Sequence, residues 1–255
     1  MVEEFFVSTP QGRLFARHWP ADGRSAPIIL FHDSLGSVDL WRDFPALLSE
    51  ATGRAVLAYD RLGFGRSDPR RGRLPPTFVA DEALNLPYLC GKFAADSVVL
   101  FGHSVGGGMA LSAAAQFPSV TAAVVTEAAQ AFVEDRILDG IRAAKADFEK
   151  PGQFERLRRY HGDNAQWVLD AWTEAWHSEA FAGWTLDDAL RRVTCPILAI
   201  HGEHDEYGSE AHPRRIGELP ANGQSLILRD CGHIPHREKP EEVLDAVRDF
   251  LRDIA

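Results

Sequence analysis

The chain is poor in the residues that would cross-link it or carry it into a membrane. Cysteine occurs three times, at Cys90, Cys195 and Cys231. An odd number without framework spacing predicts free thiols in a reducing compartment. No apolar run approaches the roughly 18 residues that span a bilayer, and the first residues are acidic where a secretory signal would be basic. We therefore expect a cytoplasmic protein with no membrane partner.

Positive charge is also scarce. The sequence holds 27 Lys and Arg residues against 37 Asp and Glu residues, a formal net charge of −10. Affinity for nucleic acids comes mostly from neutralising phosphates, so this balance argues against a nucleic-acid partner. An arginine-rich stretch at 61–73 is the local exception, and we interpret it as a solvated loop. The fractions of hydrophobic residues (45%) and charged residues (25%) are those of a globular protein.

Short apolar runs alternate with helical patterns along most of the chain. Two segments, 5–9 and 13–19, flank a Pro-Gln-Gly turn and predict an antiparallel hairpin. Continuous apolar runs, typical of strands buried on both faces of a parallel sheet, occur at 27–31, 55–59, 98–101, 120–125, 197–200 and 225–228. Helical spacing is found at 41–48, 109–114 and 243–251. This alternation predicts an α/β fold with a mostly parallel sheet and helices on both faces.

The segment 130–192 interrupts the alternation. It offers no good strand and holds nine of the chain's 25 aromatic residues. We interpret it as a helical lid over an apolar substrate pocket, because pockets favour subdomain interfaces. The alternative is that these aromatics only form the segment's own small core. Trp172 and Trp176 share a helical face, and we expect both to line the pocket.

The strongest chemical signal follows the run at 98–101. Gly102-His103-Ser104-Val105-Gly106 is a G-x-S-x-G motif between a buried strand and an alanine-rich helix. In this context the serine occupies a sharp, strained turn that exposes its hydroxyl at the carboxyl end of the sheet. The helix N-terminus points its dipole at developing negative charge. The motif therefore predicts Ser104 as a nucleophile.

With these motifs the chain resembles the α/β-hydrolase superfamily over nearly its whole length. The stretch from Asp60 to Ser67 is similar to the family's D-x-x-G-x-G-x-S marker. The resemblance implies an eight-stranded sheet with a helical cap inserted after strand six. It also implies a core domain of residues 1–129 and 193–255 and a cap subdomain of residues 130–192.

The same resemblance nominates the nucleophile's partners, because the family's acid and histidine follow late strands. The acid would be Asp205, in a G-x-x-D segment, and the base His233, which follows a glycine after the last strand. Glu127 and His236 are the alternatives. The base would take the Ser104 proton, and the acid would orient the imidazole.

An oxyanion hole needs two backbone N–H groups. One would belong to Val105 and the other, by resemblance, to Ser34. The Ser34 loop carries His32-Asp33 where the family's commonest pattern has His-Gly, and is more similar to enol-lactonases. We expect the Asp33 side chain to point away from the oxyanion or to accept hydrogen bonds from its own loop. His32, Asp33 and His103 are expected near the pocket, with the His103 ring beside the nucleophile.

A metal site is the alternative interpretation of several of these histidines. His201 and His204 form one H-x-x-H pair, and His233 and His236 form another. Asp205 and His233 already have places in the hydrolase pattern, so we predict neither a metal nor a cofactor.

The sequence thus predicts a serine hydrolase that cleaves a small, partly apolar ester or lactone through an acyl-Ser104 intermediate. Hydrolysis of a carbon–carbon bond in a diketone-like substrate is an alternative, and peracid formation and acyl transfer remain open. A ligand receptor that keeps an intact triad is the alternative from another class.

Overall fold

The computed structural model describes residues 1–23, 25–93 and 95–254. Its centre is one eight-stranded sheet with the strand order β1-β2-β4-β3-β5-β6-β7-β8. The strands are β1 (Glu3–Thr9), β2 (Gly12–Trp19), β3 (Ile28–Phe31), β4 (Val56–Tyr59), β5 (Val98–His103), β6 (Thr121–Glu127), β7 (Ile197–Gly202) and β8 (Gly223–Leu228). The β1–β2 and β2–β4 pairs are antiparallel, and the other pairs are parallel. The predicted hairpin and the six predicted apolar strands are confirmed.

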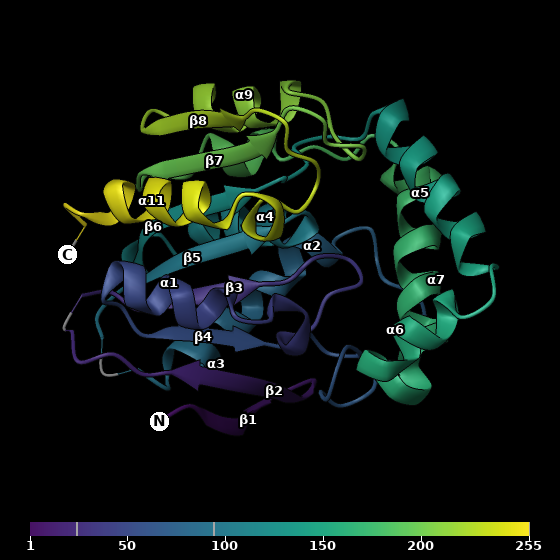
Figure 1. Ribbon diagram of the computed structural model, residues 1–255, viewed down its shortest axis with the longest axis horizontal. Helices are drawn as coiled ribbons and strands as arrows, with labels where there is room; N and C mark the ends of the chain where they lie inside the picture. The colour runs from purple at the N-terminus through teal and green to yellow at the C-terminus, as the bar shows by residue number, and fades with distance from the viewer. Residues whose placement is uncertain (24, 94, 255) are drawn as a thin grey trace.

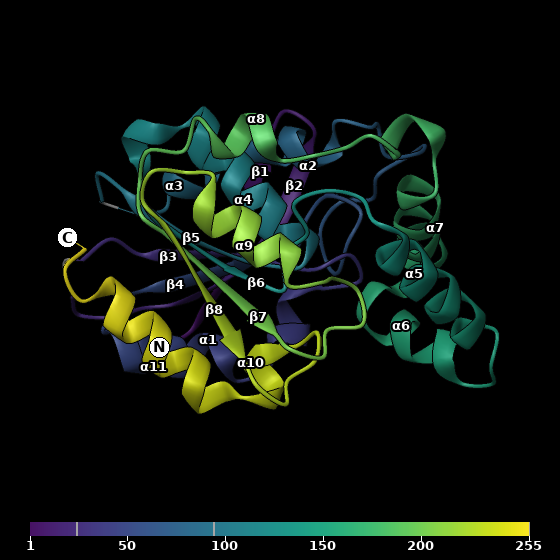
Figure 2. The ribbon, with the colours of Figure 1, turned by 90° about the horizontal axis from the view of Figure 1, so that it is seen from above.

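The central strands are mostly apolar because helices cover both faces of the sheet (Figure 2). Every residue of β3, β4 and β5 is buried. One face packs against α1 (Phe44–Thr52) and α11 (Pro240–Leu251). The other face packs against α2 (Phe78–Asp81), α3 (Leu86–Cys90), α4 (Val105–Gln116), α8 (Asp187–Leu190) and α9 (Ala211–Glu218). Short helical turns complete the core at η1 (Val38–Trp41), η2 (Glu82–Asn85), η3 (Pro118–Val120) and α10 (Pro235–Glu238).

The helical spacing at 41–48 corresponds to an α-helix only from residue 44 onward. Trp41 ends η1, and α1 begins three residues later at Phe44. Between them Arg42 has φ 53° and ψ −124°, a backbone conformation that no helix contains. Pro45, in the first turn of α1, then favours a new start.

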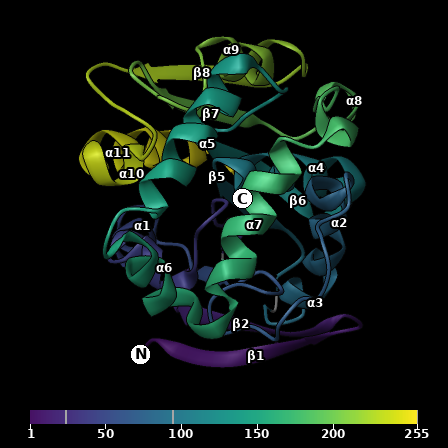
Figure 3. The same ribbon diagram turned by 90° about the vertical axis from the view of Figure 1, so that its right-hand side faces the viewer.

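Apart from α8, the helices inserted between β6 and β7 lie beyond the carboxyl ends of the parallel strands (Figures 1 and 3). They are α5 (Asp135–Phe148), α6 (Gln153–His161) and α7 (Ala165–Trp176), with short turns at η4 (Gly162–Asn164) and η5 (Glu179–Phe181). Residues 130–192, all of which the structure describes, contain no strand beyond the isolated bridge Phe132–Thr185. The α/β-hydrolase fold with helices inserted after the sixth strand is thus confirmed. Within the described residues, the structure holds no helix with the length and hydropathy of a membrane span.

Candidate active site

Ser104 occupies the sharp turn between β5 and α4. Its backbone has φ 54° and ψ −127°, strained values for a residue other than glycine. The turn is held by a 2.8 Å hydrogen bond from Ser104 N to Glu127 O. A Cβ atom on Gly106 would come within 2.1 Å of Phe31 O, and one on Gly102 within 2.2 Å of Gly106 O. Only glycines let the helix start this close to the sheet.

Three loops at the carboxyl ends of β5, β7 and β8 bring Ser104, Asp205 and His233 together. His233 Nε2 lies 3.1 Å from Ser104 Oγ. On the other side of the ring, His233 Nδ1 lies 2.8 Å from Asp205 Oδ1 and 2.9 Å from Oδ2. Burial opposes ionisation of Asp205, but the nearby His233 outweighs it and keeps the pKa of this carboxyl below its usual value.

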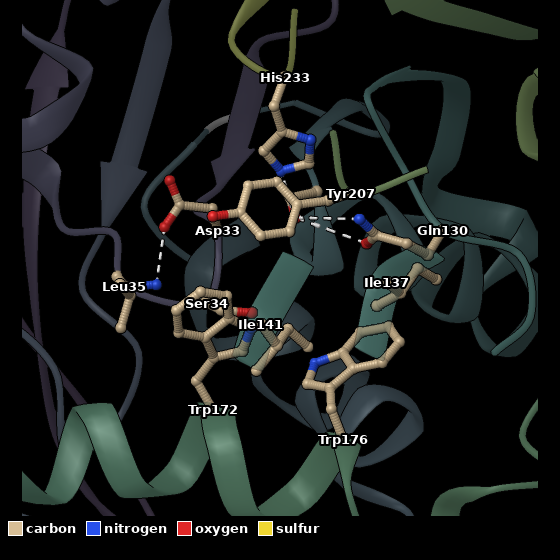
Figure 4. Close-up of a pocket in the computed structure, with 11 residues that line it drawn as sticks. Asp33, Ser34, Leu35, Gln130, Ile137, Ile141, Trp172, Trp176, Tyr207 and His233 are labelled. Atoms are coloured by element: carbon tan, nitrogen blue, oxygen red, sulfur yellow. Dashed lines mark hydrogen bonds between the residues drawn. The ribbon is translucent and has the colours of Figure 1, made fainter. Parts of the chain in front are cut away.

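The Ser104 hydroxyl opens into a cavity of about 150 Å³ between the sheet edge and the inserted helices (Figure 4). Ile137 and Ile141 of α5 and Trp172 and Trp176 of α7 form its apolar wall. The complete lining is Asp33, Ser34, Leu35, Ser104, Gln130, Ile137, Ile141, Trp172, Trp176, Tyr207 and His233.

The loop after β3 brings Ser34 to this cavity. Among the hydrogen bonds of the described residues, neither the Ser34 N–H nor the Val105 N–H has an acceptor within the protein. Asp33 Oδ1 accepts a 2.8 Å hydrogen bond from Leu35 N, so the carboxylate is held by its own loop, one of the two arrangements expected for it. The other oxygen, Asp33 Oδ2, lies 3.3 Å from His103 Nδ1.

His103 and His32, which the sequence also places near the pocket, lie beneath the loop and do not line the cavity. His103 Nε2 donates a 2.8 Å hydrogen bond to the carbonyl oxygen of His233. Although burial disfavours its charge, the carboxylates of Asp33 and Glu127 raise the pKa of His103 to about 9. His32 Nδ1 lies 2.8 Å from Asp33 O, and its Nε2 accepts from Arg61 N. Both rings therefore support the loop after β3 from the side of the core.

The alternative acid and base are paired with each other. Glu127 Oε1 lies 2.5 Å from His236 Nδ1, and both side chains are buried. The His236 ring packs on Trp41 and Phe44. No hydrogen bond among the described residues joins Glu127 to His233 or His236 to Ser104.

Sequence reasoning missed five of the lining residues: Leu35, Gln130, Ile137, Ile141 and Tyr207. The amide of Gln130 lies 3.5 Å from Ser104 Oγ. Tyr207 N donates to Asp205 Oδ1 at 2.7 Å, and its ring lies 4.7 Å from that of His233. Both residues closely follow strand ends, and in open α/β sheets ligands bind at the carboxyl ends of strands. That rule could have predicted Gln130 and Tyr207 as residues that line the cavity.

Two groups of side chains within the described ranges bring three metal-ligating atoms to within 4.8 Å of one another. They are the buried His103, Glu127 and His236 and the exposed Glu203, His204 and Asp230. In the buried group, Glu127 Oε1 is already bonded to His236 and His103 Nε2 to His233 O. Two of its other polar atoms, Glu127 Oε2 and His236 Nε2, have no hydrogen-bond partner among the described residues.

Comparison with known proteins assigns the family. Residues 28–246 match the alpha/beta hydrolase family. The chain is 28% identical to serine hydrolase BPHL of Homo sapiens over 233 residues, which cover 88% of this chain and 79% of that protein. It is 30% identical to the non-heme chloroperoxidase of Streptomyces lividans over 267 residues, which cover 90% of this chain and 92% of that protein. Naproxen esterase from Bacillus subtilis shares the fold, with a TM-score of 0.76 and 18% identity over 98% of this chain and 92% of that one. The chain belongs to the alpha/beta hydrolase family, and its relatives support a hydrolase.

Proposed function

We propose that the protein is a serine hydrolase that cleaves a small ester or lactone through an acyl-Ser104 intermediate. The observation that carries this proposal is the 3.1 Å approach of His233 Nε2 to Ser104 Oγ. It is supported by the Asp205 contact on the other ring nitrogen and by the cavity into which the hydroxyl opens.

The reaction begins when Ser104 Oγ attacks the substrate carbonyl while His233 Nε2 takes the hydroxyl proton. Asp205 keeps the other proton of the ring on Nδ1 and stabilises the imidazolium. The Ser34 and Val105 N–H groups and the N-terminus of α4 donate to the oxyanion. Collapse of the tetrahedral intermediate breaks the ester bond, and His233 returns its proton to the leaving oxygen. Water, deprotonated by His233, then releases the acid and regenerates Ser104.

The inserted segment 130–192 acts as a cap in this proposal, and residues 1–129 and 193–255 form the core domain. Ile137, Ile141, Trp172 and Trp176 give the cavity an apolar wall, which favours a substrate with an apolar part beside the reacting carbonyl.

Hydrolysis of short-chain nitrophenyl esters by Ser104→Ala tests the mechanism. We expect turnover to fall by at least about 10³-fold, because the histidine and oxyanion donors cannot replace the nucleophile. The matched control is Ser119→Ala, at an exposed serine after α4, which keeps wild-type turnover. Retained turnover in purified Ser104→Ala would overturn the mechanism.

The same assay separates the alternatives when lactones, a β-diketone and an ester with added hydrogen peroxide are included. Preference for the diketone favours carbon–carbon bond hydrolysis, and peracid formation favours a perhydrolase. Very slow turnover together with a ligand-induced rise in melting temperature favours a receptor.

A further inference from the structure

A second and wider hollow adjoins the Ser104 cavity. This outer groove has a volume of about 800 Å³ and shares Leu35, Trp172 and Tyr207 with the cavity. One wall comes from α5 and α6, and the other from the core, where Arg42 follows η1 and Arg237 lies in α10. A substrate whose carbonyl lies at Ser104 therefore has the outer groove as room for its remote end.

Positive charge gathers along the outer groove. Arg42 and Arg237 line it from the core, and Arg156 and Arg159 from α6. Among the described residues, none of these four guanidinium groups has a carboxylate within ion-pair distance, although the chain carries a net charge of −10. Arg158, beside them on α6 but outside the groove, does pair with Glu155 at 3.7 Å.

The groove also has two carboxylates, and neither neutralises these arginines. Asp147 pairs with Lys150 at 2.6 Å, outside the groove. Glu206 is exposed and has no ion pair with a described residue. The groove is thus lined by four arginines and two carboxylates, and the charge of one carboxylate is already neutralised by a lysine outside the groove.

Arg237 is held so that part of its guanidinium still lacks an acceptor. Nη2 donates to Leu40 O, whereas the buried Nε has no partner among the described residues. Burial lowers the pKa of Arg237, and the positive charge of Arg42 lowers it further. The carbonyl that accepts from Arg237 belongs to Leu40, two residues before Arg42, so the two arginines line the same part of the groove. An anion bound beside them in the groove would offset the repulsion between the two guanidinium groups.

We propose that the outer groove binds an anionic group, a carboxylate or a phosphate, on the part of the substrate remote from the bond cleaved at Ser104. Arg42 and Arg237 contact the anion, and Arg156 and Arg159 attract it from the opposite wall. The inference rests on the proposed function, since it assigns the substrate class of the same site: anionic esters or lactones.

The test compares nitrophenyl monoesters of glutarate and suberate with their neutral methyl esters. The wild-type protein has the higher kcat/KM on the anionic member of at least one pair. In Arg42→Gln the ratio of anionic to neutral kcat/KM falls about tenfold, the effect of losing one charge-assisted contact. Arg158→Gln, the matched control outside the groove, keeps the wild-type ratio. Inhibition of neutral-ester hydrolysis by glutarate indicates a carboxylate ligand, and stronger inhibition by inorganic phosphate indicates a phosphate.

The outcomes distinguish this inference from the proposed function. If the ratio of anionic to neutral kcat/KM is equal in the wild type and Arg42→Gln while neutral esters are still cleaved, the proposed anion site is overturned. The proposed ester hydrolysis is then unaffected. If no ester is cleaved, calorimetric titration of the wild type with glutarate and with phosphate decides. Binding that weakens in Arg42→Gln supports an anion site in a protein that is not an esterase, and no binding of either anion overturns the site.

Discussion

At the scale of single residues, the partners of each ring nitrogen determine what each buried histidine does. His103 Nε2 has the His233 carbonyl as acceptor, and its Nδ1 lies 3.3 Å from the carboxylate of Asp33, an arrangement that favours the protonated ring. His32 and His161 each pair one nitrogen with an N–H donor and the other with a carbonyl oxygen. Burial lowers the pKa of both rings, so they are neutral and fixed in one tautomer.

Substitution of each carboxylate distinguishes Asp205 from Glu127 as the catalytic acid. Asp205→Asn removes the carboxylate that orients His233, and we expect kcat to fall about 10³- to 10⁴-fold. Glu127→Gln disturbs the separate pair with His236 and lowers kcat far less. Steady-state hydrolysis of a nitrophenyl ester measures both, with Asp230→Asn, at an exposed loop carboxylate, as the control. A larger loss in Glu127→Gln than in Asp205→Asn would exchange the two assignments.

The buried charge of His103 makes stability depend on pH. Its pKa is raised to about 9 in the folded protein, against 6.5 for an unperturbed histidine. The folded state therefore holds this proton more tightly, and the stabilisation is complete below pH 6.5 and lost as the pH rises through 9. We expect the free energy of unfolding to fall by up to about 1.4 kcal/mol per pH unit between pH 7 and 9.

Chemical denaturation at several pH values, with His103→Asn as the comparison, measures this effect. Since asparagine does not titrate, the variant should lose less stability over the same range, whatever its absolute stability. Parallel curves for the two proteins would show that His103 is not the group responsible.

At the scale of elements, one side chain joins the inserted helices to the loops of the core. His161, the last residue of α6, accepts a 2.9 Å hydrogen bond from Gly65 N at Nδ1. Its Nε2 lies 2.9 Å from Leu35 O, next to Ser34. Phe64 and Trp167 pack around this junction. The loop that carries Ser34 is thus held by His161 from the inserted helices and by His32 and His103 from the core.

His161→Ala tests this arrangement. The variant leaves the partly buried N–H of Gly65 and the carbonyl oxygen of Leu35 without partners, and we expect a loss of about 2 kcal/mol in the free energy of unfolding. Because the loop carries the Ser34 N–H, kcat on a neutral ester should also fall about tenfold. His161→Gln restores a donor and should recover part of kcat. His177→Ala, at an exposed histidine after α7, is the control. A variant with wild-type kcat would remove His161 from any role in positioning the loop.

At the scale of the whole molecule, the candidate site residues that could be predicted from the sequence are those that closely follow a strand. Ser104, Asp205 and His233 each follow a strand by a few residues, and a local motif together with the family resemblance was enough to nominate them. The contacts of His161 and the convergence of Arg42 with Arg237 join residues far apart in the chain, and no local pattern carries them. The break at Arg42 was missed for another reason, because apolar spacing at 41–48 continued across a residue whose backbone conformation ends a helix. The cytoplasmic location and the domain boundaries stay predictions.

The most direct test of the central claim is intact-mass and peptide analysis after treatment with a fluorophosphonate, which reacts with serines activated by a neighbouring base. We expect one adduct per chain, located on Ser104, absent in Ser104→Ala and formed much more slowly in His233→Ala. An unlabelled wild-type protein that still cleaves esters, or an adduct on another residue, would contradict it.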